Sequence, residues 1–347
     1  MDMIVTQGLC KTFKSKGKDK GTGKDAGVEA VRDVDLRVRE GEIYGFLGPN
    51  GAGKTTTMRM LTTLMAPTRG TATVVGHDLF RESRRIRQDI GYVSQKGGAY
   101  EYASGYENLV LQGRLYGLTR AEARDKADRI VLQFDMADYA RRIVQTYSGG
   151  QRRHVDLGMG VMHDPKLLFL DEPTTGLDPH SRARFWDVIR TLRREGITIF
   201  LTTHYLDEAD QLCDALCIMD HGRVVAAGSP EELKREVSGD VVEIGLDPAN
   251  VAQAAGLLEG MGGVCSLETT ENSVKLLVES GETVLPAALP RLVQAGIAVA
   301  RVEMKRPTLD EVFQKVTGRA LTEAEIEAAA GGGGAGSGAG SGGGGWT

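Results

Sequence analysis

A glycine-rich segment at residues 48–55 constrains the fold of this chain more than any other feature. It has the sequence GPNGAGKT, follows an apolar run at residues 44–47 and opens a helical pattern, which is the strand, loop and helix context of a phosphate-binding P-loop. The glycines let backbone N–H groups surround phosphates without Cβ clashes, and the helix N-terminus adds about half a positive charge. We expect nucleotide contacts from Gly48, Pro49, Asn50, Gly51, Ala52, Gly53, Lys54, Thr55 and Thr56.

A pair of carboxylates far along the chain complements this loop. Residues 167–170 form an apolar run that ends in Asp171 and Glu172, so a buried strand brings both carboxylates to the edge where open α/β sheets bind ligands. We expect Lys54 to reach the β- and γ-phosphates, and Thr55 and Asp171 to bind Mg²⁺. Glu172 is then free to polarise a water for attack on the γ-phosphate. The Asn-Lys-x-Asp motif of GTPases is absent from the sequence, so ATP is the expected nucleotide.

Short apolar runs alternate with helical patterns between residues 43 and 220. This alternation predicts an α/β fold, a P-loop NTPase core with a mostly parallel sheet covered on both faces. We expect strands at residues 42–47, 90–94, 166–170, 196–201 and 215–219. The helices between them are expected at residues 54–64, 149–162, 181–194 and 206–212. Residues 100–163 break the alternation with helices alone, near 107–116 and 120–134, and are expected to form an inserted helical subdomain.

The pattern changes near residue 239, where we place the end of the ATPase domain, residues 1–238. Residues 239–320 follow the order strand, helix, strand, strand, helix, strand, which is a split βαβ arrangement. We expect a small C-terminal accessory α+β domain there, without a catalytic group. Residues 321–347 are expected to form a short helix, opened by Thr322, and then a flexible Gly-rich tail. The lysine-rich residues 11–24 predict a solvated loop, with an anionic lipid surface as the functional alternative.

The overall charge and hydropathy restrict the partners of the chain. It has 42 Lys and Arg against 47 Asp and Glu, a net charge of −5, which argues against nucleic acid as a partner. No window approaches the roughly 18 apolar residues of a membrane span, so we expect a soluble or peripheral protein. The 4 cysteines are too few and too scattered for a disulfide framework, which favours a reducing compartment.

An ordered set of further motifs resembles one family. Tyr147, Ser148, Gly149, Gly150 and Gln151 stand upstream of the carboxylate pair, Gly176-Leu177-Asp178 follows it, His204 comes after a predicted strand, and Gln95 comes after an earlier one. Together with the P-loop, this set resembles the nucleotide-binding subunit of ATP-binding cassette (ABC) transporters over residues 3 to about 235.

The resemblance implies roles for these residues. Gln95 would sense the γ-phosphate, Mg²⁺ and the attacking water, so the implied catalytic set is Lys54, Gln95, Glu172 and His204. Phe13 would stack on adenine; the alternative is a core aromatic that ends a first strand. Ser148, Gly149, Gly150 and Gln151 would clamp the γ-phosphate bound to a second copy of the chain, and Asp178 would communicate across that homodimer; alone, the Ser-Gly-Gly run would be an ordinary helix cap.

A closer resemblance lies at residues 307–313, PTLDEVF, and at residues 147–179. Both are similar to the daunorubicin and doxorubicin resistance exporters, whose C-terminal region is associated with communication to the nucleotide site or with assembly. The alternative for residues 308–313 is a capped helix with Phe313 packed on the small domain.

The resemblance implies an ATPase at the cytoplasmic face of the cell membrane, docked on separate transmembrane permease subunits that contact the transported drug or lipid-like molecule. Tyr100, Tyr102 and Tyr106 are candidates for the permease contact, with ordinary surface aromatics as the alternative. The competing function is a soluble ABC-type clamp on ribosomes or DNA; the single P-loop and the lack of long heptads argue against it.

Overall fold

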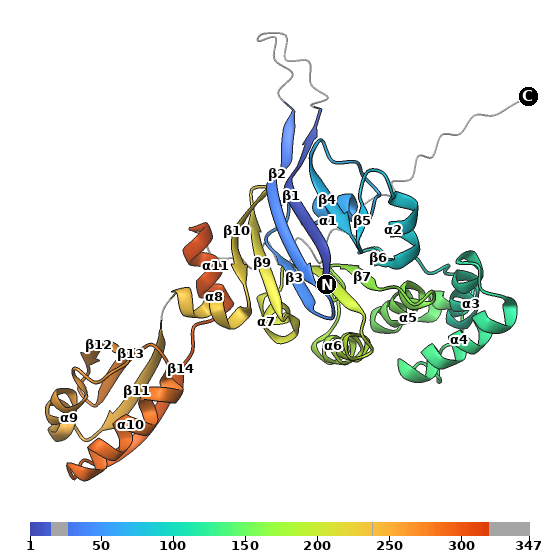
Figure 1. Ribbon diagram of the computed structural model, residues 1–347. Helices are drawn as coiled ribbons and strands as arrows, with labels where there is room; N and C mark the ends of the chain where they lie inside the picture. Colours follow the sequence, from blue (N-terminus) through green and yellow to red (C-terminus); the bar gives the residue numbers. More distant parts are fainter. Residues whose placement is uncertain (15–26, 238, 319–347) are drawn as a thin grey trace, which may run out of the picture.

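The computed structural model describes residues 1–14, 27–237 and 239–318 (Figure 1). Most of the predicted lysine-rich loop, the helix opened by Thr322 and the Gly-rich tail lie outside these residues. Among the described residues, no helix has the length and the apolar run needed to cross a bilayer.

A six-stranded sheet forms the centre of the larger part of the molecule, in the order β10-β9-β3-β8-β7-β6. Its neighbours pair in parallel except for β10, which is antiparallel to β9. The strands are β3 (Ile43–Leu47), β6 (Ile90–Val93), β7 (Leu167–Asp171), β8 (Thr198–Thr203), β9 (Ala215–Asp220) and β10 (Arg223–Gly228). The mostly parallel sheet is therefore confirmed, and β10 is an addition to it.

Both faces of this sheet are covered. All five residues of β3 are buried; Ile43 and Leu47 belong to one apolar cluster, whereas Tyr44 and Phe46 belong to another. Alternate residues of a strand point to opposite faces, so each face has its own core. The helices of this part outside the helical insertion are α1 (Lys54–Leu61), α2 (Ser83–Asp89), α6 (Pro179–Arg194), α7 (Leu206–Leu212) and α8 (Pro230–Val237).

A second, antiparallel sheet covers α1 and was not predicted in detail. Its order is β2-β1-β4-β5, with β1 (Asp2–Phe13), β2 (Val28–Arg39), β4 (Arg69–Val74) and β5 (His77–Asp78). The second half of β2 alternates strictly between exposed and buried residues, the period-2 pattern of a strand with one covered face. That alternation was present in the sequence and could have revealed the sheet.

The predicted helical insertion lies to one side of the sheets, as α3 (Gly105–Leu115), α4 (Arg120–Gln133), a short 3₁₀ turn η1 (Val144–Thr146) and α5 (Gly149–Val161) (Figure 1). Capping boxes start all three α-helices, from Ser104, Thr119 and Ser148. Each box satisfies two backbone N–H groups at a helix end, so the sequence determines sharply where these helices begin.

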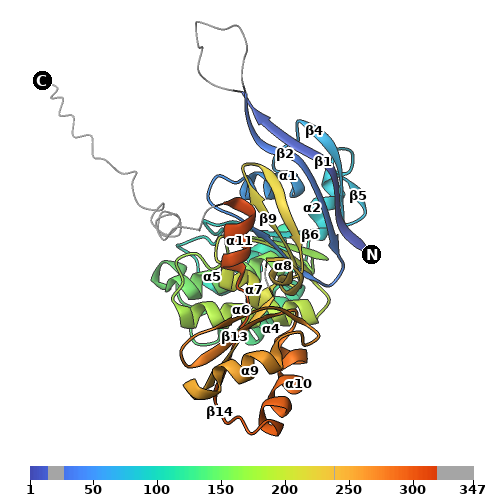
Figure 2. The same ribbon diagram turned by 90° about the vertical axis from the view of Figure 1, so that its left-hand side faces the viewer.

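A small domain projects from the side of α8 and α11 (Leu309–Thr317) (Figures 1 and 2). Its antiparallel sheet has the order β12-β13-β11-β14, which confirms the split βαβ arrangement. The elements are β11 (Asp240–Leu246), η2 (Pro248–Asn250), α9 (Val251–Leu258), β12 (Val264–Thr269), β13 (Ser273–Val278), α10 (Gly281–Gln294) and β14 (Val299–Lys305).

The last described helix, α11, returns to the larger part. Its Leu309, Val312 and Phe313 are buried in the same cluster as α7 and α8 residues, and Lys315 Nζ donates a hydrogen bond to Glu236 O at 2.9 Å. The alternative in which Phe313 packs on the small domain is therefore wrong, because its apolar partners lie on α7 and α8. By its packing, α11 belongs with residues 1–237, and we call these segments together the P-loop domain.

Candidate functional site

The P-loop turns sharply between the end of β3 and the start of α1. At Gly48 a Cβ atom would lie 2.2 Å from Met219 O, and at Gly53 (φ 110°) 2.6 Å from Ala30 O. No other residue fits such close approaches. Lys54 Nζ donates hydrogen bonds to Gly48 O at 2.6 Å and Pro49 O at 3.1 Å. The Lys54 side chain therefore turns back onto the P-loop and is held by its carbonyl groups.

Lys54, Glu172 and His204 form a buried cluster of ionisable side chains. Lys54 Nζ lies 3.4 Å from Glu172 Oε1, and His204 Nδ1 lies 3.5 Å from Glu172 Oε2. Burial lowers the pKa of Lys54 from its usual value. Burial acts to raise the pKa of Glu172, but the interactions with His204 and Lys54 outweigh it, and the net pKa is lowered. Glu172 is therefore held as a carboxylate, the form that can accept a proton.

The backbone at Glu172 has an unusual conformation. Its φ of 45° lies in the left-handed region, where a non-glycine residue is strained, as is common at functional sites. Its N–H donates to Thr202 O at 3.1 Å and to Thr202 Oγ1 at 3.0 Å, which holds this conformation at the end of β7. The neighbouring β8 thus fixes where the carboxylate points.

Asp171 and Thr55 meet at the same edge. Thr55 Oγ1 and Thr202 Oγ1 donate to Asp171 Oδ1 at 3.1 and 2.8 Å. Burial raises the pKa of Asp171 despite these bonds. Gln95, which follows β6, donates from Nε2 to Glu172 Oε2 at 2.9 Å.

The donors in this group fit Mg²⁺. A hydroxyl, a carboxylate and an amide are hard oxygen ligands, and Mg²⁺ is commonly held by one or two carboxylates together with nucleotide phosphates and water. In the described part of the chain, no group of three or more His, Cys, Asp or Glu residues could hold a metal ion by itself.

His204 carries a further sign of a missing ligand. Both of its ring nitrogens are buried and make no hydrogen bond to the described residues: Nδ1 has only the 3.5 Å contact with Glu172 Oε2 given above, and Nε2 has no partner among them. Buried polar atoms in folded proteins are normally hydrogen-bonded. The site therefore contains hydrogen-bonding capacity that a phosphate oxygen could use.

The other predicted residues lie apart from this cluster. Ser148 caps α5, with Gln151 N–H donating to Ser148 Oγ at 3.3 Å, and Ser148 and Gly149 are exposed. Asp178 is also exposed and caps α6 through Ser181. Phe13 ends β1 but is 39% exposed, with Lys11 Nζ 5.5 Å from its ring centroid. Phe13 is therefore not a core residue, and the alternative offered for it is wrong.

The sequence analysis missed Arg153, which is buried on α5 and donates hydrogen bonds to the carbonyls around Gln95 and Glu172. The only signal for it was a charged residue within the apolar pattern of a helix. Thr202 was not predicted either, because no motif marks it.

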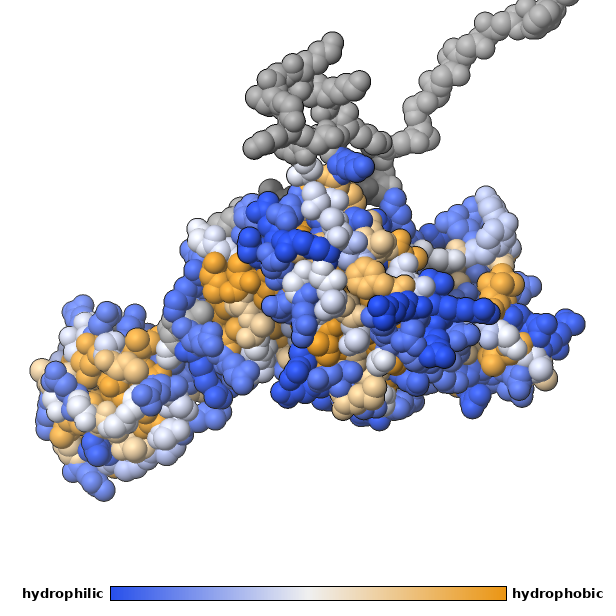
Figure 3. All heavy atoms as spheres, turned by 45° about the horizontal axis from the view of Figure 1, so that its top comes forward, coloured by the Kyte–Doolittle hydropathy of each residue, from blue (hydrophilic) through white to orange (hydrophobic). Residues whose placement is uncertain are grey.

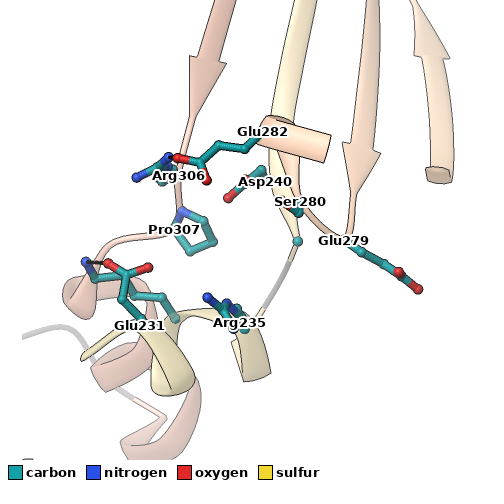
Figure 4. A pocket seen from close by; sticks show the side chains of 10 residues that line it. Glu231, Arg235, Asp240, Glu279, Ser280, Glu282, Arg306 and Pro307 are labelled. Carbon is teal, nitrogen blue, oxygen red and sulfur yellow. Dashed lines mark hydrogen bonds and ion pairs between the residues drawn. The ribbon is translucent and has the colours of Figure 1, made fainter. Parts of the chain in front are cut away.

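A polar cavity of about 340 Å³ lies where α8 meets the small domain (Figure 4). Glu231 and Arg235 of α8 face it from one side, and Arg306 pairs with Glu282 on the other. None of the predicted nucleotide-binding residues lines it, so it is separate from the site described above.

Comparisons with known proteins agree with this geometry. The family model of the ABC transporters matches residues 31–175, and that of the C-terminal domain of DrrA1-3-like ATP-binding proteins matches residues 228–317. A model of an AAA domain, described as a putative AbiEii toxin of a type IV toxin–antitoxin system, matches residues 150–206.

Several curated proteins match most of the chain. The daunorubicin resistance ATP-binding protein DrrA3 of Streptomyces coeruleorubidus is 44% identical over 84% of this chain and 92% of its own length. The daunorubicin/doxorubicin resistance ATP-binding protein DrrA of Streptomyces peucetius is 40% identical over 93% and 95%. The linearmycin resistance ATP-binding protein LnrL of Bacillus subtilis (strain 168) is 31% identical over 84% and 95%.

Solved structures match the larger part of the molecule. The ATP-binding subunit of an ABC transporter has a TM-score of 0.57 at 27% identity, covering 67% of this chain and 92% of its own. A dimeric ATP-binding cassette in a post-hydrolysis state with ADP and Pi has a TM-score of 0.58 at 23% identity, over 65% and 98%, a likeness of fold alone. The chain therefore belongs to the ABC transporter family, as an ATP-binding and ATP-hydrolysing protein with a DrrA-like C-terminal domain.

Proposed function

We propose that this chain is the ATPase subunit of a membrane exporter for hydrophobic drugs or lipid-like molecules, and that two copies share two ATP sites. One observation carries the proposal: the chain buries a catalytic cluster around Glu172 but leaves Ser148 and Gly149 exposed at a helix N-terminus. A helix N-terminus with a serine hydroxyl favours an anion. The phosphate that it would bind is therefore on another copy.

The residues of one chain account for the chemistry. Lys54 is held by the carbonyls of Gly48 and Pro49, and a bound triphosphate would replace them as its partner. Glu172, kept ionised by Lys54 and His204, would take a proton from the attacking water, and His204 would hydrogen-bond the γ-phosphate. Thr55, Asp171 and Gln95 would hold Mg²⁺, which neutralises charge on the β- and γ-phosphates when bound. The products are ADP and phosphate.

The second clamp gives the cycle its mechanical step. ATP held by the P-loop of one subunit and by Ser148, Gly149, Gly150 and Gln151 of the other would close the dimer, and hydrolysis would reopen it. Such a cycle is a population shift driven by a ligand that binds the closed state better. Asp178, exposed at the start of α6, would contact the other subunit in this dimer. Phe13, exposed at the end of β1, would stack on adenine.

The helical insertion offers a surface for the permease subunits. Tyr106, Val110 and Leu111 line a groove of about 460 Å³ between α3 and α4, together with Arg114, Arg120 and Arg124. Tyr100 and Tyr102 are exposed and contact each other edge to face nearby. The permeases would place this chain at the cytoplasmic face of the membrane and contact the transported molecule themselves. The relatives named above are resistance proteins for daunorubicin, doxorubicin and linearmycin, which supports a similar class of cargo.

The substitution Glu172→Gln tests the proposed chemistry. It keeps the size of the side chain but removes the base, so we expect ATP binding to persist and hydrolysis to fall by about 10²- to 10⁴-fold. An ATP-bound dimer should then accumulate in size-exclusion chromatography with light scattering. Glu271→Gln, at an exposed turn of the small domain, is the matched control and should hydrolyse ATP normally. Undiminished turnover by Glu172→Gln would remove Glu172 as the base.

A further inference from the structure

Arg153 joins α5 to the catalytic edge of its own chain. Its guanidinium is buried and donates from Nε to Pro173 O at 2.6 Å, from Nη1 to Ser94 O at 2.8 Å and Gln95 O at 3.3 Å, and from Nη2 to Asp171 O at 3.2 Å and Glu172 O at 3.1 Å. A guanidinium has five N–H donors. All five are used on carbonyls next to Gln95 and Glu172.

Asp156, three residues further along α5, holds the same loop at its other end. Asp156 Oδ1 accepts hydrogen bonds from Gly98 N at 2.8 Å and Ala99 N at 3.0 Å. Between these contacts, a Cβ at Gly97 would lie 2.4 Å from Asp156 Oδ2. The loop at residues 94–99 is therefore fixed to α5 at both ends, by carbonyls on Arg153 and by amides on Asp156.

The two contacts make α5 and the catalytic groups one mechanical unit. Residues three apart on a helix share a face, and Ser148, the cap of α5, lies less than two turns before Arg153. A rotation of α5 must carry Gln95 and Glu172 with it or break hydrogen bonds to a buried guanidinium. Removing the hydrogen-bond partners of a buried charge costs much more free energy than removing those of an exposed charge. Movement of Ser148, Gly149 and Gly150 at the start of α5 is therefore coupled to the position of Glu172.

We propose that Arg153 and Asp156 are positioning residues that transmit the state of one ATP site to the base of the other. This inference rests on the proposed function, in which the tip of α5 binds the nucleotide held by the partner subunit. Nucleotide at that tip orients Glu172 and Gln95 of the same subunit, which act on the other nucleotide. The coupling runs within one chain, through α5, between two sites of the dimer.

Hybrid dimers with a single active base test the direction of this coupling. One copy keeps Glu172 and its partner carries Glu172→Gln, with different tags for purification. Arg153→Lys, which keeps the positive charge but loses the five N–H donors of the guanidinium, is introduced into either copy. On the copy with the active base, it should lower kcat by about 10-fold. On the partner copy, whose α5 tip serves the active site, the change should stay within about twofold. The reverse pattern would mean that Arg153 only shapes its own tip, and would overturn the proposal.

A second arm empties the other site. Lys54→Ala on the copy with Glu172→Gln removes the nucleotide that touches α5 of the active copy, and hydrolysis should fall by about 10-fold. With Arg153→Lys already on the active copy, the same change should have no further effect, because the connection is already broken. A full additional fall would contradict transmission through Arg153. This arm separates communication from a general loss of structure.

Controls keep the test interpretable. Arg152→Lys changes the neighbouring residue, which pairs with the exposed Glu101, and should leave every rate unchanged. Asp156→Asn should reproduce the dependence on which copy is altered, and it replaces Arg153→Lys if that variant does not fold. Normal thermal unfolding and normal binding of a fluorescent ATP analogue establish folding. If the dimer with Glu172→Gln on both copies still hydrolyses ATP, the proposed base is wrong; if only the copy dependence fails, the coupling is wrong.

Discussion

Each of the two domains contains a lysine–glutamate pair, and the two pairs differ in their surroundings. In the P-loop domain, Lys54 and Glu172 have side chains 4% and 6% exposed and lie 3.4 Å apart. In the small domain, Lys275 and Glu243 are 42% and 25% exposed and lie 3.8 Å apart. Exposed pairs contribute little to stability, whereas buried ones shift pKa values and mark functional sites.

This difference extends to the whole of the two domains. Between residues 239 and 305, Ser273 is the only buried polar side chain among those described, whereas the P-loop domain buries Lys54, Arg153, Asp171, Glu172 and His204, among others. Figure 3 shows an apolar area on the small domain bordered by hydrophilic residues. Parallel strands end together at one edge and bring charged groups into a covered site, while the small antiparallel sheet has a core that is apolar apart from Ser273. The comparison indicates that the buried chemical groups belong to the P-loop domain.

Replacing the lysine of each pair by alanine should give the largest difference between the two pairs, in kcat/KM for ATP. Lys54→Ala removes the buried cation that would bind the phosphates, and we expect kcat/KM for ATP to fall by about 10³-fold, about 4 kcal/mol. Lys275→Ala should change it by less than about twofold. Phosphate release and binding of a fluorescent ATP analogue measure both variants. Equal losses would break the comparison.

Truncation of one core residue in each domain tests whether α11 belongs to the P-loop domain. Phe313→Ala should lower the free energy of unfolding of the P-loop domain by roughly 3 kcal/mol, because a fully buried phenyl ring is lost. Leu276→Ala, buried in β13, should lower the stability of the small domain by about 2 to 5 kcal/mol and leave ATP hydrolysis intact. Urea unfolding followed by tryptophan fluorescence distinguishes them in a Trp346→Phe background, which leaves Trp186 of α6 as the only tryptophan. Destabilisation of the small domain by Phe313→Ala would show that α11 packs with the small domain and would contradict its assignment to the P-loop domain.

Acid should affect the two domains differently. All 6 histidines lie in the P-loop domain, and burial lowers the pKa of His154 from 6.5 to about 4. Below pH 6.5 His154 is protonated in the unfolded chain, whereas in the folded chain it is protonated only below about pH 4. The free energy of unfolding therefore decreases as the pH falls from 6.5 to about 4, by up to about 3 kcal/mol.

The measurement is the urea midpoint of the P-loop domain between pH 7.5 and pH 5. His154→Gln should flatten its dependence on pH, while His221→Gln, at an exposed position, should not. An unchanged slope in His154→Gln would contradict the assigned burial effect. His163, whose pKa burial also lowers, should contribute in the same direction.

The smallest effect on stability is expected at the proposed permease surface. Replacing Tyr100 and Tyr102 by alanine together should change the free energy of unfolding by less than about 0.5 kcal/mol per site, since both rings are exposed. ATP hydrolysis by the purified chain should stay normal, whereas its recovery with membranes should drop. Normal membrane recovery would exclude these two side chains as contacts and leave the groove around Tyr106 as the candidate.

The sequence predicted those parts of the site that are formed by residues adjacent in the chain. The P-loop and the Asp171-Glu172 strand end are continuous in the chain, and their strands and helices lie close to the expected residues. Arg153 could not be assigned a role, because its partners are backbone carbonyls that no residue type marks. The place of Phe313 was also out of reach, because a capped amphipathic helix can pack on either domain. Tertiary packing, rather than local pattern, decides such cases.

In the proposed dimer, one triphosphate is held by two copies of the chain. Mixing Lys54→Ala with Gly149→Asp tests it directly: Gly149 is exposed at the start of α5, where an acidic residue suits the helix but repels a phosphate. Each variant alone should be inactive, and hybrid dimers keep one intact site. Half of the dimers are hybrids with one intact site, so the mixture would recover about a quarter of the normal ATPase rate if the two sites acted independently. With the coupling through α5 proposed above, the empty second site should reduce this by about 10-fold, which is still far above the rate of either variant alone. Formation of hybrids without any recovered hydrolysis would contradict the shared site.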